Sequence, residues 1–303
     1  MAVRDHVELA LYHTADALIA RVPLETTQRI VAAGARKVFD AQGKNARWAL
    51  ANLRIAYPAW TDAERRGLGR ESYVNFGLNA IDYLRSAHWS DEEVLAHCPL
   101  EGLEHVEKAL KKGKGALLLT LHIGAWEVGV QAIALGLAAH RPSVVGRPMR
   151  NKRLYDRITG TRTRGGAELI DRRRAAQQIL RALRGGRPVG LLLDQYSRRS
   201  RGVFVPFFGV RCSTSAGMAT LAVRTGAPVV PCYVLRAGPD RHRGIFLPEL
   251  EIEYTGDRKR DIEIATACYN VALEKIVRAN PEQWMWGHRR FRHSPDLDGD
   301  PYR

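Results

Sequence analysis

The segment that most constrains the fold is a nearly uninterrupted apolar run at 116–121, Ala-Leu-Leu-Leu-Thr-Leu. A run without polar alternation is typical of a strand that is buried on both faces. It is followed at 125–139 by an aliphatic, small-residue stretch of helical length. A buried strand that leads into a helix predicts an α/β fold, in which helices cover a parallel sheet.

From about residue 100 onward, the sequence alternates between short apolar segments and helical segments. Turns of the form Gly-x-Pro precede two of the apolar segments, and such turns are typical of the step from a helix into a strand. We therefore expect a mostly parallel central sheet flanked by helices. The expected strands are 116–121, 143–146, 168–170, 189–193, 229–235 and 245–252, and the expected helices are 125–139, 152–163, 173–184, 215–224 and 261–279.

The first part of the chain is expected to be helical. Two helices fill 7–40 with a break near Pro23, and a further helical region covers 44–87 with a break at Pro58. The first helix, 7–19, could pack on the core or lie in a membrane interface, and its pattern permits both. No linker composition divides the chain, so we expect one domain over 1–303, with a helical part at 1–95 and an α/β catalytic core at 100–293.

The net charge of +15, from 47 basic and 32 acidic residues, attracts anionic partners such as phospholipid, nucleic acid or an acidic carrier protein. Each basic cluster is as compatible with a solvated surface as with a binding surface. The chain carries no recognisable nucleic-acid motif, so we expect no nucleic-acid partner, although a non-catalytic basic binding protein stays a distant alternative. The clusters lie at 147–153, 172–174, 198–201 and 288–293.

Three further classes of feature are not expected. The four cysteines have no metal-site or C-x-x-C spacing, which predicts reduced thiols, no metal site and no disulfide framework. No segment offers the ~20 uncharged apolar residues that a spanning helix needs. The first residues place Asp5 where the basic region of a secretory signal would be.

A histidine and a carboxylate follow the expected strand 116–121. His122 comes directly after it, and Glu127 lies near the start of the next helix. In open α/β sheets, ligands bind at the carboxyl ends of the strands. A carboxylate within reach of an imidazole fixes its tautomer and raises its basicity, as a general base for a hydroxyl requires. The two-residue pattern alone is weak, because a lone histidine at a strand end is more often an ordinary loop residue.

Four further segments are expected at the same edge. Asp194 and Gln195 follow the strand 189–193, and a stretch with Arg162 and Arg164 follows the helix 152–163. An apolar aromatic loop covers 202–209, and small hydroxyl residues with Ser213 and Thr214 open a helix. Each of these segments also has a purely structural interpretation. Asp194 suits a helix cap, Arg164 a structural salt bridge, the phenylalanines the core, and the hydroxyl residues N-caps.

Together these residues suit acyl transfer to a hydroxyl. His122 would remove the hydroxyl proton, Glu127 would orient the imidazole, and an arginine or a helix N-terminus would face the oxyanion. Because there is no Gly-x-Ser-x-Gly elbow and no catalytic-looking cysteine, we expect direct attack without an acyl-enzyme. The expected oxyanion, phosphate or substrate contacts are Arg164, Arg162, Asp194 and Arg147, and the expected acyl-chain pocket comprises Phe204, Phe207, Phe208 and Trp126.

The chain resembles the lipid A biosynthesis (late) acyltransferases, the lauroyl and myristoyl transferases of the lysophospholipid acyltransferase superfamily. The resemblance covers about 250 residues in the family's order. By this resemblance, the family's catalytic histidine and acid correspond to His122 and Glu127, its arginine to Arg164 or Arg162, and its post-strand acid to Asp194. The matching pieces are Arg47-x4-Asn52-Leu53-x3-Tyr57-Pro58, the segment 122–127, the segment 162–166, Asp194-Gln195 with 202–209, the segment 224–231, and 281–290 with Trp284, Trp286 and His288.

The resemblance implies an acyl-carrier-protein thioester as donor, with no other cofactor, and a lipid A precursor hydroxyl as acceptor in lipopolysaccharide synthesis. It places the enzyme at the cytoplasmic face of the inner membrane. Many members carry an N-terminal spanning helix, whereas no such segment is visible in this sequence. Attachment is therefore expected to be peripheral, through the helix at 7–19 and the basic surface. Related enzymes acylate phosphatidylinositol mannosides with coenzyme A thioesters, and this alternative for donor and acceptor stays open.

Overall fold

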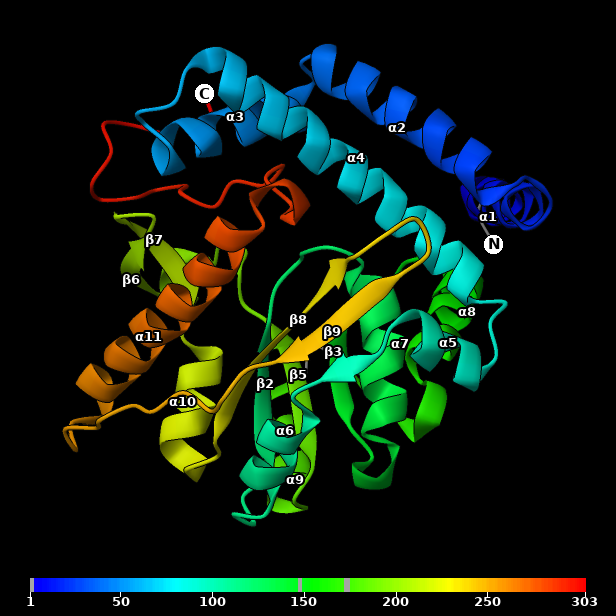
Figure 1. The fold of residues 1–303 in the computed structure, drawn as a ribbon. Helices are drawn as coiled ribbons and strands as arrows, with labels where there is room; N and C mark the ends of the chain where they lie inside the picture. The colour runs from blue at the N-terminus through cyan, green and yellow to red at the C-terminus, as the bar shows by residue number, and fades with distance from the viewer. Residues whose placement is uncertain (1–2, 147–148, 172–174) are drawn as a thin grey trace.

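A mostly parallel sheet of seven strands forms the centre of the protein (Figure 1). The computed structural model describes residues 3–146, 149–171 and 175–303. The strands lie in the order β1-β9-β8-β2-β5-β3-β4, and only β8 and β9 pair antiparallel. Their bounds are β1 Leu100–Glu101, β2 Ala116–Thr120, β3 Ser143–Gly146, β4 Glu168–Asp171, β5 Pro188–Leu192, β8 Val229–Arg236 and β9 His242–Phe246.

Strand β2 lies at the middle of the sheet, between β8 and β5. In the parallel register, Leu118 faces Val230 on one side and Gly190 on the other. Leu117 and Leu119 pack into the core on one face of the sheet, and Ala116 and Leu118 pack into the core on the other. Burial on both faces explains why this strand is apolar at almost every position.

Helices cover both faces of the sheet. Helices α10 and α11 lie to the left of the sheet in Figure 1, and α5, α7 and α8 lie to its right. Helices α9, α10 and α11 contribute buried residues to one core and α6 to the other, whereas α5 and α7 contribute to a third apolar cluster and α8 has no buried residue. The helix bounds are α5 Asp91–His97, α6 Leu103–Leu110, α7 Trp126–Gly136, α8 Lys152–Arg162, α9 Ala175–Arg184, α10 Gly217–Thr225 and α11 Arg258–Ala279.

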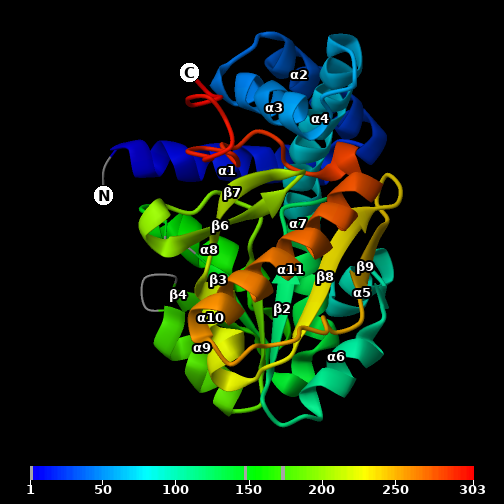
Figure 2. The same ribbon diagram turned by 90° about the vertical axis from the view of Figure 1, so that its left-hand side faces the viewer.

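Four helices form the N-terminal helical part: α1 Val3–Arg21, α2 Leu24–Asp40, α3 Lys44–Ala56 and α4 Asp62–Ser86. The longest of them, α4, crosses the edge of the sheet at which the parallel strands end (Figures 1 and 2). It begins at a capping box, in which Thr61 accepts from the backbone N–H of Glu64 and the Glu64 carboxylate accepts from that of Thr61. The α/β class and the N-terminal helical part predicted from the sequence are confirmed.

Most of the expected strands and helices lie within one to three residues of their predicted bounds, but four differences stand out. Strand β9 begins and ends earlier than the expected segment 245–252. Helices α5 and α6 were not expected. The expected loop at 202–209 belongs to a separate hairpin of β6 Gly202–Phe207 and β7 Val210–Ser215. Ser213 and Thr214 are fully buried in β7 and cap no helix, because α10 begins only at Gly217.

Candidate active site

His122 and Asp194 are brought together by the register of two neighbouring strands. Thr120 of β2 is the parallel partner of Leu192 of β5, at the carboxyl end of both strands. His122 and Asp194 each lie two residues beyond this pair. Neighbouring strands are about 4.8 Å apart, so side chains at matching positions beyond a paired position are within reach of each other. The backbone N–H of Leu193 still donates to the carbonyl of Thr120, which continues the pairing toward the site.

The Asp194 carboxylate is fully buried and accepts hydrogen bonds from three donors. Its Oδ1 lies 2.8 Å from Nδ1 of His122. Its Oδ2 accepts from the backbone N–H of His122 at 3.0 Å and from Nε1–H of Trp284 at 2.9 Å. An ionised carboxylate only accepts, so Nδ1 carries the proton and Nε2 keeps its lone pair. The imidazole is thereby held in the tautomer that is able to remove a proton from a hydroxyl.

The same contacts set the charge state of the pair. Burial by itself lowers the pKa of His122, but the charge of Asp194 and its hydrogen bond outweigh burial and raise this pKa above the ordinary value. Burial by itself raises the pKa of Asp194, but the imidazole holds it well below its usual range. Asp194 therefore stays ionised, and His122 is a stronger base than free histidine.

Glu127 makes a different contact from the one expected. It lies in the first turn of α7, and its carboxylate accepts from Arg162 at the end of α8, with Nε–Oε2 at 2.9 Å and Nη2–Oε1 at 2.6 Å. It acts on His122 through its charge, which raises the imidazole pKa. The orienting hydrogen bond expected from Glu127 comes from Asp194, because strand register brings Asp194 to the ring while α7 directs Glu127 toward α8.

The structure separates two of the three candidate arginines, Arg162 and Arg164. Arg162 contacts Glu127, and the charge and hydrogen bonds of that carboxylate outweigh burial and raise the Arg162 pKa. Arg164 contacts Ala87 and Asp91 instead of Glu127. Its Nη2 donates to the carbonyl of Ala87 at 3.3 Å, and its Nε lies 4.0 Å from Asp91. The geometry therefore supports the interpretation of Arg164 as a structural contact. Arg147 lies outside the described residues.

The phenylalanines at 204–208 are mostly core. Phe207 and Phe208 are 0% and 5% exposed and belong to the main apolar cluster. Phe204 is half-buried in β6, beneath the guanidinium of Arg199. The structure thus favours the core interpretation of this segment over the acyl wall. Trp126, the fourth residue of the expected pocket, lies edge-on to His122 with ring centroids 5.6 Å apart.

The C-terminal segment 281–290 holds in place the loop 121–125, which carries His122 and which we name the histidine loop. The backbone N–H of Met285 donates to the carbonyl of His122, and that of Gly124 donates to the carbonyl of Gln283. Nε2 of His288 lies 3.1 Å from the carbonyl oxygen of Asp194. Burial lowers the pKa of His288 to about 4, so this ring is neutral at physiological pH. The segment therefore fixes both residues of the central pair from one side.

A buried polar stripe on α4 holds the site from the other side. Five polar residues recur at alternating spacings of three and four, which places them on one helix face. Asn79 accepts from the backbone N–H of Glu127 at 3.3 Å, where α7 has no capping side chain of its own. Asn75 donates to the carbonyls of Gln283 and Gly124. The stripe, which sequence reasoning missed although its spacing is readable, comprises Ser72, Asn75, Asn79, Asp82 and Ser86.

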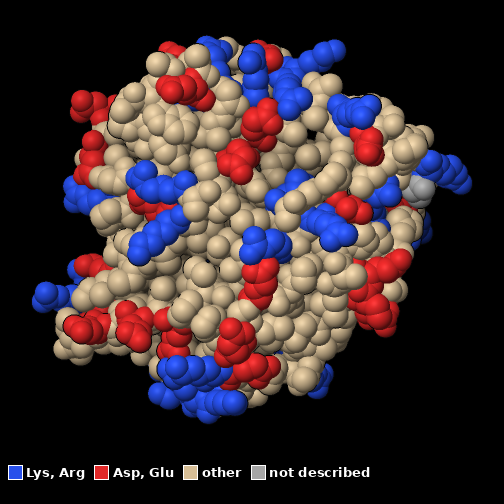
Figure 3. All heavy atoms as spheres, viewed as in Figure 1, with Lys and Arg blue, Asp and Glu red and all other residues tan. Residues whose placement is uncertain are grey.

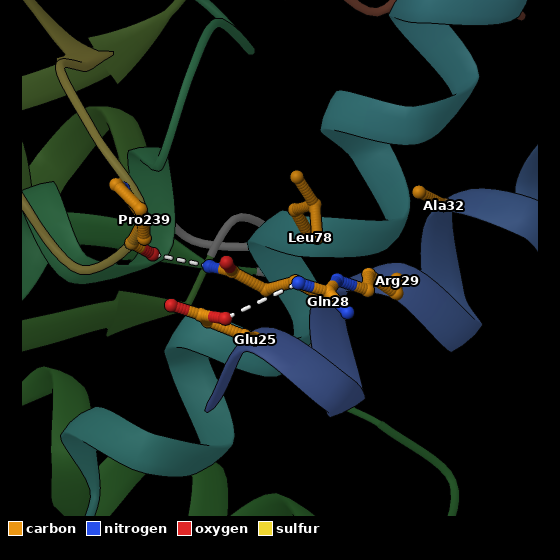
Figure 4. A pocket seen from close by; sticks show the side chains of 6 residues that line it. All are labelled: Glu25, Gln28, Arg29, Ala32, Leu78 and Pro239. Carbon is orange, nitrogen blue, oxygen red and sulfur yellow. Dashed lines mark hydrogen bonds and ion pairs between the residues drawn. The ribbon is translucent and has the colours of Figure 1, made fainter. Parts of the chain in front are cut away.

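A surface pocket and interspersed surface charges lie away from this site. A surface pocket of about 410 Å³ lies between α2, α4 and the β8–β9 connection, where the Gln28 side chain bonds the Pro239 carbonyl and Glu25 pairs with Arg29 (Figure 4). On the face seen in Figure 3, basic and acidic side chains are interspersed. Within the described residues, no group of three or more His, Cys, Asp and Glu side chains is placed to hold a metal ion.

Comparison with known proteins shows the family. The model of the bacterial lipid A biosynthesis acyltransferases matches residues 4–293. The lipid A biosynthesis lauroyltransferase of Escherichia coli K12 is 29% identical over 286 residues, which cover 92% of this chain and 89% of the relative. The palmitoleoyltransferase of the same organism is 28% identical over 250 residues, with coverage of 80% and 78%. A phosphatidylinositol mannoside acyltransferase of Mycobacterium tuberculosis is 30% identical over 175 residues, with coverage of 56% and 52%.

The family match extends over the helical part, the sheet and the segment that holds the histidine loop. An acyltransferase needs a group that removes a proton from its acceptor, and the paired imidazole at the sheet edge has the geometry of such a group. The chain belongs to the bacterial lipid A biosynthesis acyltransferase family and is an acyltransferase.

Proposed function

We propose that this enzyme moves a fatty acyl group from an acyl-carrier-protein thioester to a hydroxyl of a lipid A precursor. The observation that carries the proposal is the His122–Asp194 pair at 2.8 Å, in a chain that belongs to this family. The two relatives with the names lauroyltransferase and palmitoleoyltransferase match most of the chain, which supports an acceptor of the lipid A type.

The chemistry follows from the tautomer. Nε2 of His122 takes the proton of the acceptor hydroxyl while its oxygen attacks the thioester carbonyl. The tetrahedral intermediate then expels the thiolate, which receives that proton from the imidazolium. Asp194 stabilises the imidazolium by its charge and keeps Nδ1–H in place. General base assistance of this kind contributes roughly 10²–10⁴ in rate.

Glu127 and Arg162 form the second part of the proposed catalytic machinery. Two of the Arg162 nitrogens are engaged by Glu127, which fixes the plane of the guanidinium. A fixed positive group near the imidazole suits the oxyanion of the intermediate or a phosphate of the acceptor. The carboxylate of Glu127 also strengthens His122 as a base, because its charge raises the imidazole pKa.

The second candidate uses coenzyme A thioesters to acylate another glycolipid, such as a phosphatidylinositol mannoside. It is favoured by the similarity to the mycobacterial phosphatidylinositol mannoside acyltransferases. The His122 chemistry is the same in both cases, since each reaction transfers an acyl group from a thioester to a hydroxyl. The two candidates differ in donor and acceptor only.

We also propose peripheral attachment to the cytoplasmic face of the inner membrane through α1. Val7, Leu11 and Leu18 lie on one side of this helix and are 52%, 65% and 58% exposed. The opposite side carries the buried Asp16, which contacts His88 at 2.8 Å. A helix that turns apolar side chains outward and an acid inward suits insertion into a lipid interface. The net charge of +15 favours anionic headgroups.

No helix in the described parts of the chain combines the length and the apolar character needed to span a bilayer.

The test of the function is a lipid comparison. Total lipids of cells with and without the gene are compared by mass spectrometry, with complementation by wild-type enzyme, His122→Ala and, as a matched control, His13→Ala. We expect one acyl mass to disappear from a lipid A precursor and to return with wild type and His13→Ala only. Loss from a phosphatidylinositol mannoside would select the second candidate, and full complementation by His122→Ala would refute the mechanism.

The test of attachment is vesicle sedimentation. Leu11→Asp and Leu18→Asp are expected to reduce binding to vesicles that contain anionic lipid, whereas Val271→Asp, at a 52% exposed position on α11, is expected to bind like wild type. Equal binding of all variants would remove α1 from the membrane contact.

A further inference from the structure

A buried ion pair joins α4 to the end of β8. The turn between β8 and β9 lies against α4 (Figure 1). Nη1 of Arg236, the last residue of β8, contacts Oδ2 of Asp82 on α4, and the two side chains are 12% and 3% exposed. Burial raises the pKa of Asp82 to about 6, which leaves it ionised at neutral pH, and lowers that of the neighbouring His242 to about 3. Arg236 is therefore the cation that faces Asp82. Because desolvation offsets most of the attraction in a buried pair, its net contribution to stability is small.

The side chain of Arg236 is linked to the histidine loop through Asn75. Nε of Arg236 donates to Oδ1 of Asn75 at 3.3 Å. Nδ2 of Asn75 donates in turn to the carbonyl of Gly124 at 3.4 Å and to that of Gln283 at 2.9 Å. An amide has one accepting and one donating end, so the arginine fixes which end faces the loop. Removal of the guanidinium frees this amide to rotate.

The backbone of Arg236 is linked to the same loop through Gln283. Strand β2 pairs with β8 over 229–231 and ends before the level of Arg236. The Gln283 amide takes the place of a strand partner there. Its Oε1 accepts from the Arg236 N–H at 2.8 Å, and its Nε2 donates to the Arg236 carbonyl at 3.3 Å. The backbone N–H of Gly124 donates to the carbonyl of Gln283, so the routes through Asn75 and Gln283 both end at Gly124.

The histidine loop is packed directly against the end of β8. Gly124 has a φ of 58°, and a Cβ atom there would collide with the carbonyl oxygen of Val234 and lie 2.9 Å from Cα of Leu235. Glycine tolerates both this conformation and this approach. Because the fit is so close, a shift of the β8 end relative to the loop also shifts His122, two residues before Gly124.

We infer that Arg236 is a positioning residue for acyl transfer, which holds the histidine loop against the end of β8 by orienting the Asn75 amide. The inference rests on the proposed function, because the hold affects catalysis only if His122 of that loop is the base. The ion pair with Asp82 fixes the guanidinium so that Nε stays directed at Asn75. A displacement of about 1 Å at a catalytic group costs about 10²-fold in rate, so a small movement of the loop is measurable.

The experiment compares Arg236→Met with Arg243→Met. Arg243 on β9 is the matched control, because it pairs with Glu101 through Nε–Oε1 at 2.7 Å and Nη2–Oε2 at 2.8 Å but is 51% exposed. Activity is normalised to the folded fraction from circular dichroism. We expect Arg236→Met to lower kcat roughly 10–100-fold with KM within about twofold of wild type. Hydrogen exchange of peptides that cover 121–125 should become faster in Arg236→Met, whereas Arg243→Met should match wild type in both measurements.

A double-mutant cycle tests the route through Asn75. If Arg236 acts by orienting the Asn75 amide, Asn75→Ala and Arg236→Met lower kcat by similar factors, and the double variant loses little more. Losses that multiply in the double variant would contradict the inference. If the unpaired Asp82 prevents Arg236→Met from folding, Asp82→Asn combined with Arg236→Met leaves no unpaired buried charge and is measured in its place.

Hydrogen exchange separates failure of this inference from failure of the proposed function, because it reports the hold on the loop without any reaction. Wild-type exchange at 121–125 in folded Arg236→Met would overturn the inference. Faster exchange with wild-type kcat would also overturn it if His122→Ala is inactive. Full activity of His122→Ala, together with faster exchange in Arg236→Met, would instead overturn the proposed function.

Discussion

The Asp194 carboxylate contacts Nδ1 of His122 at 2.8 Å, although 72 residues separate them in the chain. Asp194 also accepts from the backbone N–H of His122 and from Trp284, so three donors converge on one buried acid. This arrangement fixes the position, the tautomer and the charge of the imidazole at once.

Asp194→Asn is expected to lower kcat by about 10²–10⁴, because an amide cannot accept from all three donors and its NH₂ group favours the wrong tautomer.

The wild-type enzyme needs neutral His122, so kcat/KM falls as pH drops through a pKa above the ordinary ~6.5. Without the charge of Asp194, burial lowers that pKa, and the acidic limb moves to lower pH. A pH–rate profile with an unmoved acidic limb would contradict the assignment.

Arg162 and Arg164 are expected to differ when each is replaced by methionine. Arg162→Met leaves Glu127 without its two hydrogen bonds and should lower kcat at least tenfold, an effect of about 1.4 kcal/mol or more on the barrier. Arg164→Met removes a contact to the Ala87 carbonyl and should lower stability with little change in kcat. Steady-state kinetics and urea unfolding distinguish the two. A kcat loss confined to Arg164→Met would reverse the assignment of the arginine.

Asn79→Ala is expected to lower the free energy of unfolding by about 1–3 kcal/mol, because the buried side chain accepts from the Glu127 backbone N–H, which is then left unpaired. The same change should lower kcat, since α7 carries Glu127 and begins at that hydrogen bond. Asn45→Ala, at an exposed position of α3, serves as the control and should stay within about 0.5 kcal/mol of wild type. If Asn79→Ala and Asn45→Ala were equally stable, the buried polar stripe on α4 would not hold the histidine loop in place.

Phe207→Ala is expected to destabilise the fold by about 3–5 kcal/mol, because the ring is fully buried in the main core. Phe76→Ala should cost far less, since almost half of its ring is already exposed. Denaturant unfolding measures both free energies. If Phe207→Ala instead left stability intact and shortened the preferred acyl chain, the acyl-wall interpretation of 204–208 would be restored.

The local sequence pattern was sufficient to predict much of the fold. The segment 143–146 and strand β3 coincide, and the segment at 116–121 ends one residue beyond β2. These segments are readable because burial on two faces requires uninterrupted apolar residues. Helices α5 and α6 were missed because they are short, with seven and eight residues, and offer too few turns for a clear period. The hairpin at 202–215 was missed because its aromatic residues resemble a loop that lines a pocket.

The sequence by itself placed His122 at the sheet edge, because a residue directly after a buried strand emerges there, and its role as the base stays a prediction. It also placed Asp194 after a second strand. Only the tertiary structure decided which acid meets the ring, because the pairing of Thr120 with Leu192 is a non-local register that no local period encodes. The same holds for Arg162, since the packing of α8 against α7 directs one of two nearby arginines to Glu127, while the other donates to the carbonyl of Ala87, directly after α4.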